Sequence, residues 1–207
     1  MKITIAPYSP AWPSAFLHLK KEIAGILKEL NPAIEHIGST SVPGLAAKPI
    51  IDIQVGLAST DDFPIVEEKM MAHHYIYYEV FNSTMPNRRL FVRLKEKEDQ
   101  LRFPNKFTNL DNIPHDEIND LRLAHIHVWQ QDTPDWNRHM AFREYLKAHP
   151  AVMQAYQELK MKLSEQEWQD GMAYNDGKNA FIKTMEAKAV AWHKLHLPKL
   201  SSKTTKT

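Results

Sequence analysis

The stretch HIGSTSVPGLAAKPIIDIQV, residues 36–55, joins a turn rich in glycine and hydroxyl side chains to a β-branched segment. Pro43 and Gly44 suit a type II turn, because proline presets φ and glycine tolerates positive φ. The segment PIIDIQVGL that follows predicts a strand with one buried face. Because side chains alternate along a strand, Asp52 and Gln54 are expected on one face and the apolar residues between them on the other. Asp52 therefore points into a cleft and away from the core.

The spacing within this stretch is similar to the signature of the nucleotidyltransferase (polymerase-β-like) superfamily. In that signature a hydrophobic residue and Gly-Ser or Gly-Gly precede, by about a dozen residues, an acidic pair separated by one hydrophobic residue. Here Ile37, Gly38 and Ser39 are followed by twelve residues (40–51) and then by Asp52. Gly38 allows backbone amides to approach a phosphate, and hydroxyl donors come from three successive residues, Ser39, Thr40 and Ser41.

Asp52 is the candidate catalytic carboxylate and metal ligand, with Mg²⁺ or Mn²⁺ as the expected cofactor. Two acids on this strand would hold two metals for in-line phosphoryl transfer. Gln54 stands at the second position and offers a neutral oxygen, which makes it a weak metal ligand. Two functions stay open. One is a metal-dependent nucleotidyltransferase acting on a nucleoside triphosphate and an unknown small-molecule acceptor. The other is a catalytically impaired module that binds a nucleotide or phosphometabolite.

The segment HIHVW adds a second group of candidate ligands. His125 and His127 are two residues apart on a predicted strand, so both imidazoles face the same side, as chelation of a metal requires. His127 is also the candidate catalytic ligand or base opposite Asp52, and His36 could join the group. Two alternatives are a pair of hydrogen-bonded structural histidines and a phosphohydrolase-like use of the pair with a transition metal. Trp129 stands where a triple-histidine hydrolase would have its third histidine.

Four basic residues are candidate phosphate ligands. Arg89 and Arg93 are four residues apart on one face of a predicted strand and could hold phosphates; the alternative, which the pattern favours slightly, is a solvated edge strand that carries charges. Lys48 follows the glycine turn and could neutralise a phosphate. Lys178, near the start of the last predicted helix, could present its ammonium group to an anion together with free backbone amides.

The pattern along the chain predicts an α+β fold: a nucleotidyltransferase-like mixed sheet with flanking helices and a helical C-terminal part. Strands are predicted at residues 34–38, 49–57, 75–80, 88–94 and 123–130. Helices are predicted at residues 11–30, 61–73, 133–149, 150–163 and 175–197. Residues 1–198 are expected to form a single domain, and the polar tail at 199–207 is expected to be disordered.

Net charge, cysteine content and the length of apolar runs exclude several classes of function. The 207 residues carry a formal net charge of +1, so there is no strong nucleic-acid signal, and the expected partner is a nucleotide or phosphorylated small molecule. The chain contains no cysteine, which excludes a thiolate nucleophile and a zinc–thiolate site. No apolar run approaches the length of a membrane span, and we expect a cytoplasmic protein. Oligomeric state stays open.

Several ordered segments together resemble the GrpB family, nucleotidyltransferase-like proteins largely without assigned activity. They are EHIGSTSVPGLAAKPIIDI, YSPAWPSAF, HIHVW, RHMAFREYLKAHP and KNAFI. The resemblance covers nearly the whole chain and implies a nucleotidyltransferase-like fold. Some relatives are fused to dephospho-coenzyme A kinase, which implies a link to nucleotide or coenzyme metabolism. The position of Gln54 is often not acidic in that family, so the resemblance implies that the missing second acid is a trait of the family.

Overall fold

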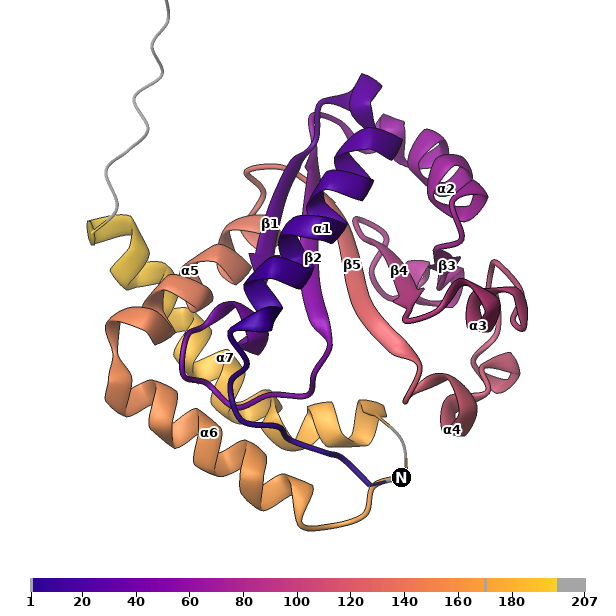
Figure 1. Ribbon diagram of the computed structural model, residues 1–207. Coiled ribbons are helices and arrows are strands. Elements are labelled where there is room, and N and C mark those ends of the chain that lie inside the picture. Colours follow the sequence, from indigo (N-terminus) through magenta and orange to yellow (C-terminus); the bar gives the residue numbers. More distant parts are fainter. Residues whose placement is uncertain (1, 170, 197–207) are drawn as a thin grey trace, which may run out of the picture.

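The computed structural model describes residues 2–169 and 171–196; the tail predicted to be disordered, 199–207, lies outside them (Figure 1). The strands are β1 (Ala33–Ile37), β2 (Ile51–Leu57), β3 (Ile76–Tyr77), β4 (Arg89–Leu94) and β5 (Arg122–Gln130). The α-helices are α1 (Ala11–Ile26), α2 (Phe63–Ala72), α3 (Lys97–Leu101), α4 (His115–Ile118), α5 (Pro134–Ala148), α6 (Pro150–Ser164) and α7 (Gly171–His196). Short 3₁₀ turns lie at η1 (Lys28–Leu30), η2 (Ser39–Ser41), η3 (Thr60–Asp62), η4 (Glu79–Asn82) and η5 (Leu110–Asn112).

The strands form one mixed sheet in the order β1-β2-β5-β4-β3. β2 and β5 run parallel at its centre, and the other neighbouring strands pair antiparallel. The predicted α+β fold with a mixed sheet is therefore confirmed. The parallel pairing matters for the site, because it places Asp52 of β2 beside His125 of β5 and Gln54 beside His127.

The two faces of the sheet are covered by different helices. α1 and α2 pack on one face, where their apolar side chains join Ile53, Val55 and Ile126 in the main core. On the other face α5 approaches β1 and β5, and α5, α6 and α7 pack together as the helical C-terminal part (Figure 1). Thr133 caps the start of α5 by accepting a hydrogen bond from the Trp136 backbone N–H, as the Thr-Pro pattern predicts.

Several predicted boundaries were wrong for local reasons. The first helix ends at Ile26 and not at residue 30, because the chain tightens into η1 and Asn31 adopts a left-handed conformation with φ of 44°. The strand predicted at 75–80 is only Ile76–Tyr77, since the chain turns into η4 directly afterwards. The last helix begins at Gly171, four residues before the predicted start.

Candidate functional site

The glycine turn is pressed against strand β2. Gly38 has φ of +69°, a conformation that favours glycine, and a Cβ built there would lie 2.9 Å from the Cβ of Asp52. The Ser41 backbone N–H and hydroxyl donate hydrogen bonds to the Gly38 carbonyl at 3.2 and 2.6 Å. Glycine at position 38 therefore allows the turn and the acidic strand residue to lie in direct contact.

Asp52 is held by a histidine from the neighbouring strand. His125 Nδ1 lies 3.1 Å from Asp52 Oδ1, and both side chains are partly exposed. Burial opposes ionisation of Asp52. The hydrogen bond from His125 and the charges of His125, His127 and Lys178 outweigh this effect and lower the pKa of the carboxyl below its ordinary value. An ionised carboxylate with a fixed orientation is the result.

Asp52 and His125 lie in the wall of a cavity of about 620 Å³. The cavity is bounded by the N-terminal segment, the glycine turn, strands β2, β4 and β5, and helices α4, α6 and α7. It brings together seven of the residues that the sequence predicted: Ser39, Thr40, Lys48, Asp52, His125, His127 and Lys178. Gly38 and Ser41 shape the turn behind the wall.

Three lysines converge on one end of this cavity. Lys48 and Lys178 place their ammonium groups 4.4 and 4.5 Å from the centre of the Tyr174 ring. Lys160 Nζ lies 3.1 Å from Ser39 Oγ and also donates to the Ala46 carbonyl. Within residues 2–169 and 171–196, none of the three lysines forms an ion pair. The lysine cluster, as we call Lys48, Lys160 and Lys178, is therefore cationic without a carboxylate in contact.

Burial dominates the electrostatics of the lysine cluster. Burial, assisted by the charge of Lys178, lowers the pKa of Lys160 to about 7. Burial and the charges of Lys178 and Arg122 lower the pKa of Lys48 to about 8, and burial lowers that of Lys178 to about 8. Each lysine is destabilised in its charged form, and an anion placed among them would restore the charged state.

Lys160 was missed in the sequence because it lies on α6, far from every motif. Its side chain is 2% exposed although lysines are almost never fully buried without a partner. The available signal was its position four residues after Tyr156, on the buried side of α6, where a helical pattern expects an apolar residue.

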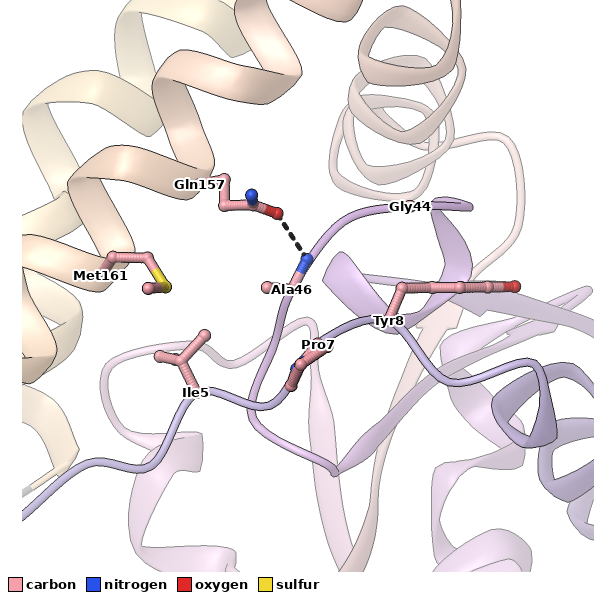
Figure 2. Close-up of a pocket in the computed structure, with 7 residues that line it drawn as sticks. All are labelled: Ile5, Pro7, Tyr8, Gly44, Ala46, Gln157 and Met161. Atoms are coloured by element: carbon pink, nitrogen blue, oxygen red, sulfur yellow. Dashed lines mark hydrogen bonds between the residues drawn. The ribbon is translucent and has the colours of Figure 1, made fainter.

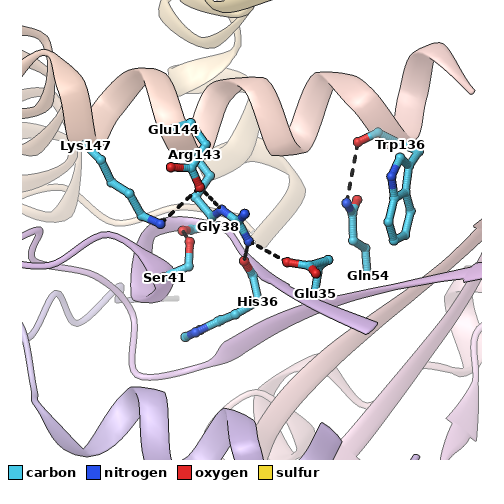
Figure 3. A network of polar contacts seen from close by, with 9 residues as sticks. All are labelled: Glu35, His36, Gly38, Ser41, Gln54, Trp136, Arg143, Glu144 and Lys147. Carbon is cyan, nitrogen blue, oxygen red and sulfur yellow. Dashed lines mark hydrogen bonds and ion pairs between the residues drawn. The ribbon is translucent and has the colours of Figure 1, made fainter. Parts of the chain in front are cut away.

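The prediction of Gln54 as a metal ligand needs correction. Gln54 shares a strand face with Asp52, as alternation requires, but it is fully buried and its Nε2 lies 3.5 Å from the Trp136 carbonyl of α5 (Figure 3). Gly56 permits this cover, since a Cβ there would meet the Trp136 ring at 2.8 Å. Helix α5 therefore closes this part of the face, and Gln54 does not line the cavity.

The donor set does not match a two-metal site. Asp52 supplies one carboxylate, and the neighbouring His125 and His127 are imidazoles, whereas Mg²⁺ prefers oxygen ligands. Burial, with the charge of Arg88, keeps the pKa of His127 well below its ordinary value. Across the part of the chain that the structure describes, no group of three or more histidine, aspartate or glutamate side chains could hold a metal ion.

Arg89 and Arg93 also need correction, because they lie on the opposite face of the sheet. In β4 it is Leu90 that pairs with His127 and Val92 that pairs with His125. Arg89 and Arg93 pair with Val128 and Ala124, so they point to the other face, toward α1 and α2. There Arg89 forms an ion pair with Glu67, and Arg93 lies 3.6 Å from Glu22. Neither arginine lines the cavity, and β4 is not an edge strand.

Helix α5 anchors the glycine turn through Arg143. Its guanidinium donates to the His36 carbonyl at 2.7 Å and to Glu35 at 3.0 Å (Figure 3). His36 itself lies 3.0 Å from the Thr40 hydroxyl and stacks on Phe16. Burial lowers the pKa of His36 to about 4. His36 is thus a neutral residue that supports the turn from behind.

A second, smaller hollow of about 250 Å³ lies where the N-terminal segment crosses the loop after the glycine turn (Figure 2). Ala6 and Ala47 exchange two backbone hydrogen bonds there, and Gln157 accepts a hydrogen bond from the Ala46 N–H at 2.8 Å. Its lining is largely apolar and contains no charged side chain: Ile5, Pro7, Tyr8, Gly44, Ala46, Gln157 and Met161. The charged residues of the site all belong to the larger cavity.

A comparison with protein-family models identifies the family of this chain. A match to the GrpB protein family covers residues 2–188. The chain belongs to the GrpB family. The UPF0157 protein YqkA of Bacillus subtilis is 31% identical over 193 residues, which are 93% of this chain and 49% of YqkA, so the chain spans about half the length of that relative.

A solved structure of a GrpB family member supports the fold. The crystal structure of the conserved protein GrpB from Enterococcus faecalis is 30% identical, with a TM-score of 0.72 over 92% of this chain and 99% of that chain. More distantly, a dephospho-CoA kinase of Mycobacterium tuberculosis is 23% identical over 165 residues, 75% of this chain and 38% of the kinase. In the described residues of this GrpB protein, no helix is long and apolar enough to cross a membrane.

Proposed function

We propose that this GrpB protein binds a phosphorylated small molecule in the cavity beside Asp52, with a nucleoside polyphosphate as the first candidate. The observation that carries the proposal is the lysine cluster: Lys48, Lys160 and Lys178 converge on one wall with lowered pKa values and, among the described residues, without ion pairs. Lys160 is buried and Lys48 and Lys178 are half-buried, and a phosphate would compensate the cost of charging ammonium groups in such surroundings.

The glycine turn supports the same reading. Ser39 lines the cavity and lies within hydrogen-bond distance of Lys160, so a phosphate oxygen at this point would meet a hydroxyl and an ammonium group together. Charge-assisted hydrogen bonds of this kind are among the stronger polar contacts in proteins. The similarity to a dephospho-CoA kinase agrees with a phosphorylated, nucleotide-like ligand.

Calorimetric titration with inorganic pyrophosphate and with ATP, each in EDTA, tests the proposal. We expect binding without a divalent metal, because the lysine cluster supplies the charge. Lys178→Met should weaken binding by about tenfold or more, since it removes one charge-assisted contact. Lys183→Met is the matched control, because Lys183 lies on the same helix with an exposed side chain. Absence of binding by the folded wild-type protein would refute the proposal.

Metal-dependent nucleotidyl transfer is the second candidate. The contact between Gly38 and Asp52 favours it, because it sets the turn and the acidic residue side by side as the nucleotidyltransferase spacing predicts. Release of pyrophosphate from ATP in the presence of Mg²⁺ or Mn²⁺, lost in Asp52→Asn, would support transfer. Binding of ATP without pyrophosphate release across a panel of hydroxyl and amine acceptors would leave the binding function alone.

A further inference from the structure

Four polar side-chain atoms are buried on the sheet face that carries Asp52 and His125. They are Gln54 Oε1, Arg88 Nε, His127 Nδ1 and Trp129 Nε1, and none has a hydrogen-bond partner within residues 2–169 and 171–196. A buried donor or acceptor without a partner costs about 1 to 3 kcal/mol, and native proteins contain few of them. Four in one neighbourhood indicate a place where a polar group from outside the chain belongs.

The strand register places these atoms together. Gln54 of β2 pairs with His127 of β5, and Arg89 of β4 pairs with Val128 of β5. Arg88, one residue before Arg89, therefore lies beside Trp129 on the face of His127. The Arg88 guanidinium carbon is 6.0 Å from the centre of the Trp129 ring. Of the four residues, Arg88 and His127 reach the cavity wall.

Arg88 is a cation without an anion. Within the described part of the chain it forms no ion pair, and its guanidinium lies 6.0 Å from the centre of the Phe81 ring as well. Burial, followed by the charge of Arg138, lowers the pKa of Arg88 to about 10, while Asp135 acts in the opposite direction. Arginine in such a setting suits a planar or tetrahedral oxyanion, because its N–H donors match two oxygens at once.

We propose that Arg88 and His127 form a second anion subsite, which binds a carboxylate or phosphate group at the far end of the ligand held by the lysine cluster. This inference rests on the proposed binding of a phosphorylated molecule at that cluster. Strand β5 runs past both subsites. His125 lies at the end where Lys178 acts on the Asp52 carboxyl, and Trp129 lies beside Arg88. These two residues are four apart on β5. Four residues of strand span about 13 Å.

Apolar and aromatic side chains line part of the cavity that holds the two subsites. Leu90 and Val92 pair with His127 and His125 on β5, and Tyr78, Phe81 and Met85 line the same cavity. The ligand is therefore an elongated molecule with an anionic group at each end and an apolar or aromatic middle. A molecule with a phosphate at one end alone would leave Arg88 unpaired.

Three synthetic probes of one length separate the possibilities: 8-hydroxyoctyl phosphate, octane-1,8-diol bisphosphate and 8-phosphonooxyoctanoate. Calorimetry should show that the bisphosphate, the phosphonooxyoctanoate or both bind at least about tenfold more tightly than the hydroxy compound. A gain with phosphonooxyoctanoate alone assigns a carboxylate to the second subsite, and a gain with the bisphosphate alone assigns a phosphate. Equal affinity for all three compounds would overturn the second subsite.

Substitutions of Arg88 test whether this residue causes the difference in affinity between the probes. Arg88→Met should reduce the doubly charged probes to the affinity of 8-hydroxyoctyl phosphate, whose own affinity stays unchanged, and Arg88→Lys should restore part of the difference. Arg102→Met is the control, since the Arg102 side chain is 57% exposed and lies outside the cavity. An equal loss for every probe in both Arg88 variants would show a purely structural role and refute the inference. Absence of binding by all probes to the wild type would instead refute the lysine-cluster proposal.

Discussion

Gly38 lies against Asp52 so closely that a Cβ at position 38 would stand 2.9 Å from the Cβ of Asp52. The contact joins the turn and the strand of one sequence motif, and Arg143 fixes the neighbouring backbone from α5 by its hydrogen bond to the His36 carbonyl. The position of the carboxylate in the cavity thus depends on the absence of a side chain at residue 38.

The first prediction concerns this contact. Gly38→Ala combines a positive φ with a steric clash, so we expect it to lower the free energy of unfolding by about 2 to 4 kcal/mol in urea titrations. Gly25→Ala is the control, because Gly25 lies within α1 and a Cβ there meets no atom within 4 Å. The control should stabilise the protein by about 0.5 to 1 kcal/mol. An equal effect of both substitutions would contradict the close packing of the turn.

The second prediction concerns the missing acid. Gln54→Glu places a carboxylate under α5, where burial opposes its ionisation, so we expect a loss of about 3 kcal/mol or more in unfolding free energy. Gln54→Leu should cost far less, because it removes the unpaired Oε1 as well. Both are measured by chemical denaturation at pH 7. A Gln54→Glu variant of wild-type stability that gains Mg²⁺ binding would show that this position opens to the cavity.

The third prediction concerns the buried lysine. The folded pKa of Lys160, about 7, lies below its ordinary value of 10.5, so between these values the unfolded state binds more protons than the folded state. The contribution of Lys160 to the free energy of unfolding therefore increases as pH rises from 7 to 10.5. In Lys160→Met this part of the pH dependence should disappear, and pyrophosphate binding should weaken. Denaturation curves at pH 7 and 9.5 provide the measurement. The prediction is contradicted if the unfolding free energy changes between these pH values as much in Lys160→Met as in the wild type.

The fourth prediction concerns acid stability. Burial, followed by the charge of Arg138, lowers the pKa of His139 from 6.5 to about 4. The unfolded state therefore binds a proton that the folded state excludes, and stability falls as pH decreases from 6.5 to 4, by up to roughly 3 kcal/mol for this residue.

His139→Phe tests that assignment, because phenylalanine keeps a ring against His127 and Trp129. We expect thermal or urea unfolding between pH 7 and 4.5 to lose part of its pH dependence in this variant. The exposed His73, replaced in the same way, is the control. If both variants retain the full wild-type dependence, the acid sensitivity comes from other groups, of which buried His36 is the next to test.

Much of the fold could be predicted from local pattern. Alternation in residues 49–57 placed Asp52 and Gln54 on one face and the isoleucines on the other, and the strand period also put His125 and His127 on one side. The Thr133-Pro134 pair marked the start of α5. These features depend on neighbours within a few residues, so the sequence by itself determined them.

The site depended on contacts between distant segments. Lys160 lies 121 residues from Ser39 in the chain, yet its ammonium group is 3.1 Å from the serine hydroxyl. Alternation predicted that Arg89 and Arg93 share a face, but the pairing of β4 with β5 decided that this face meets α1 and α2. In the same way α5 covers Gln54 and leaves Asp52 open. Periodicity determines which side chains share a face, whereas only tertiary packing decides what that face meets.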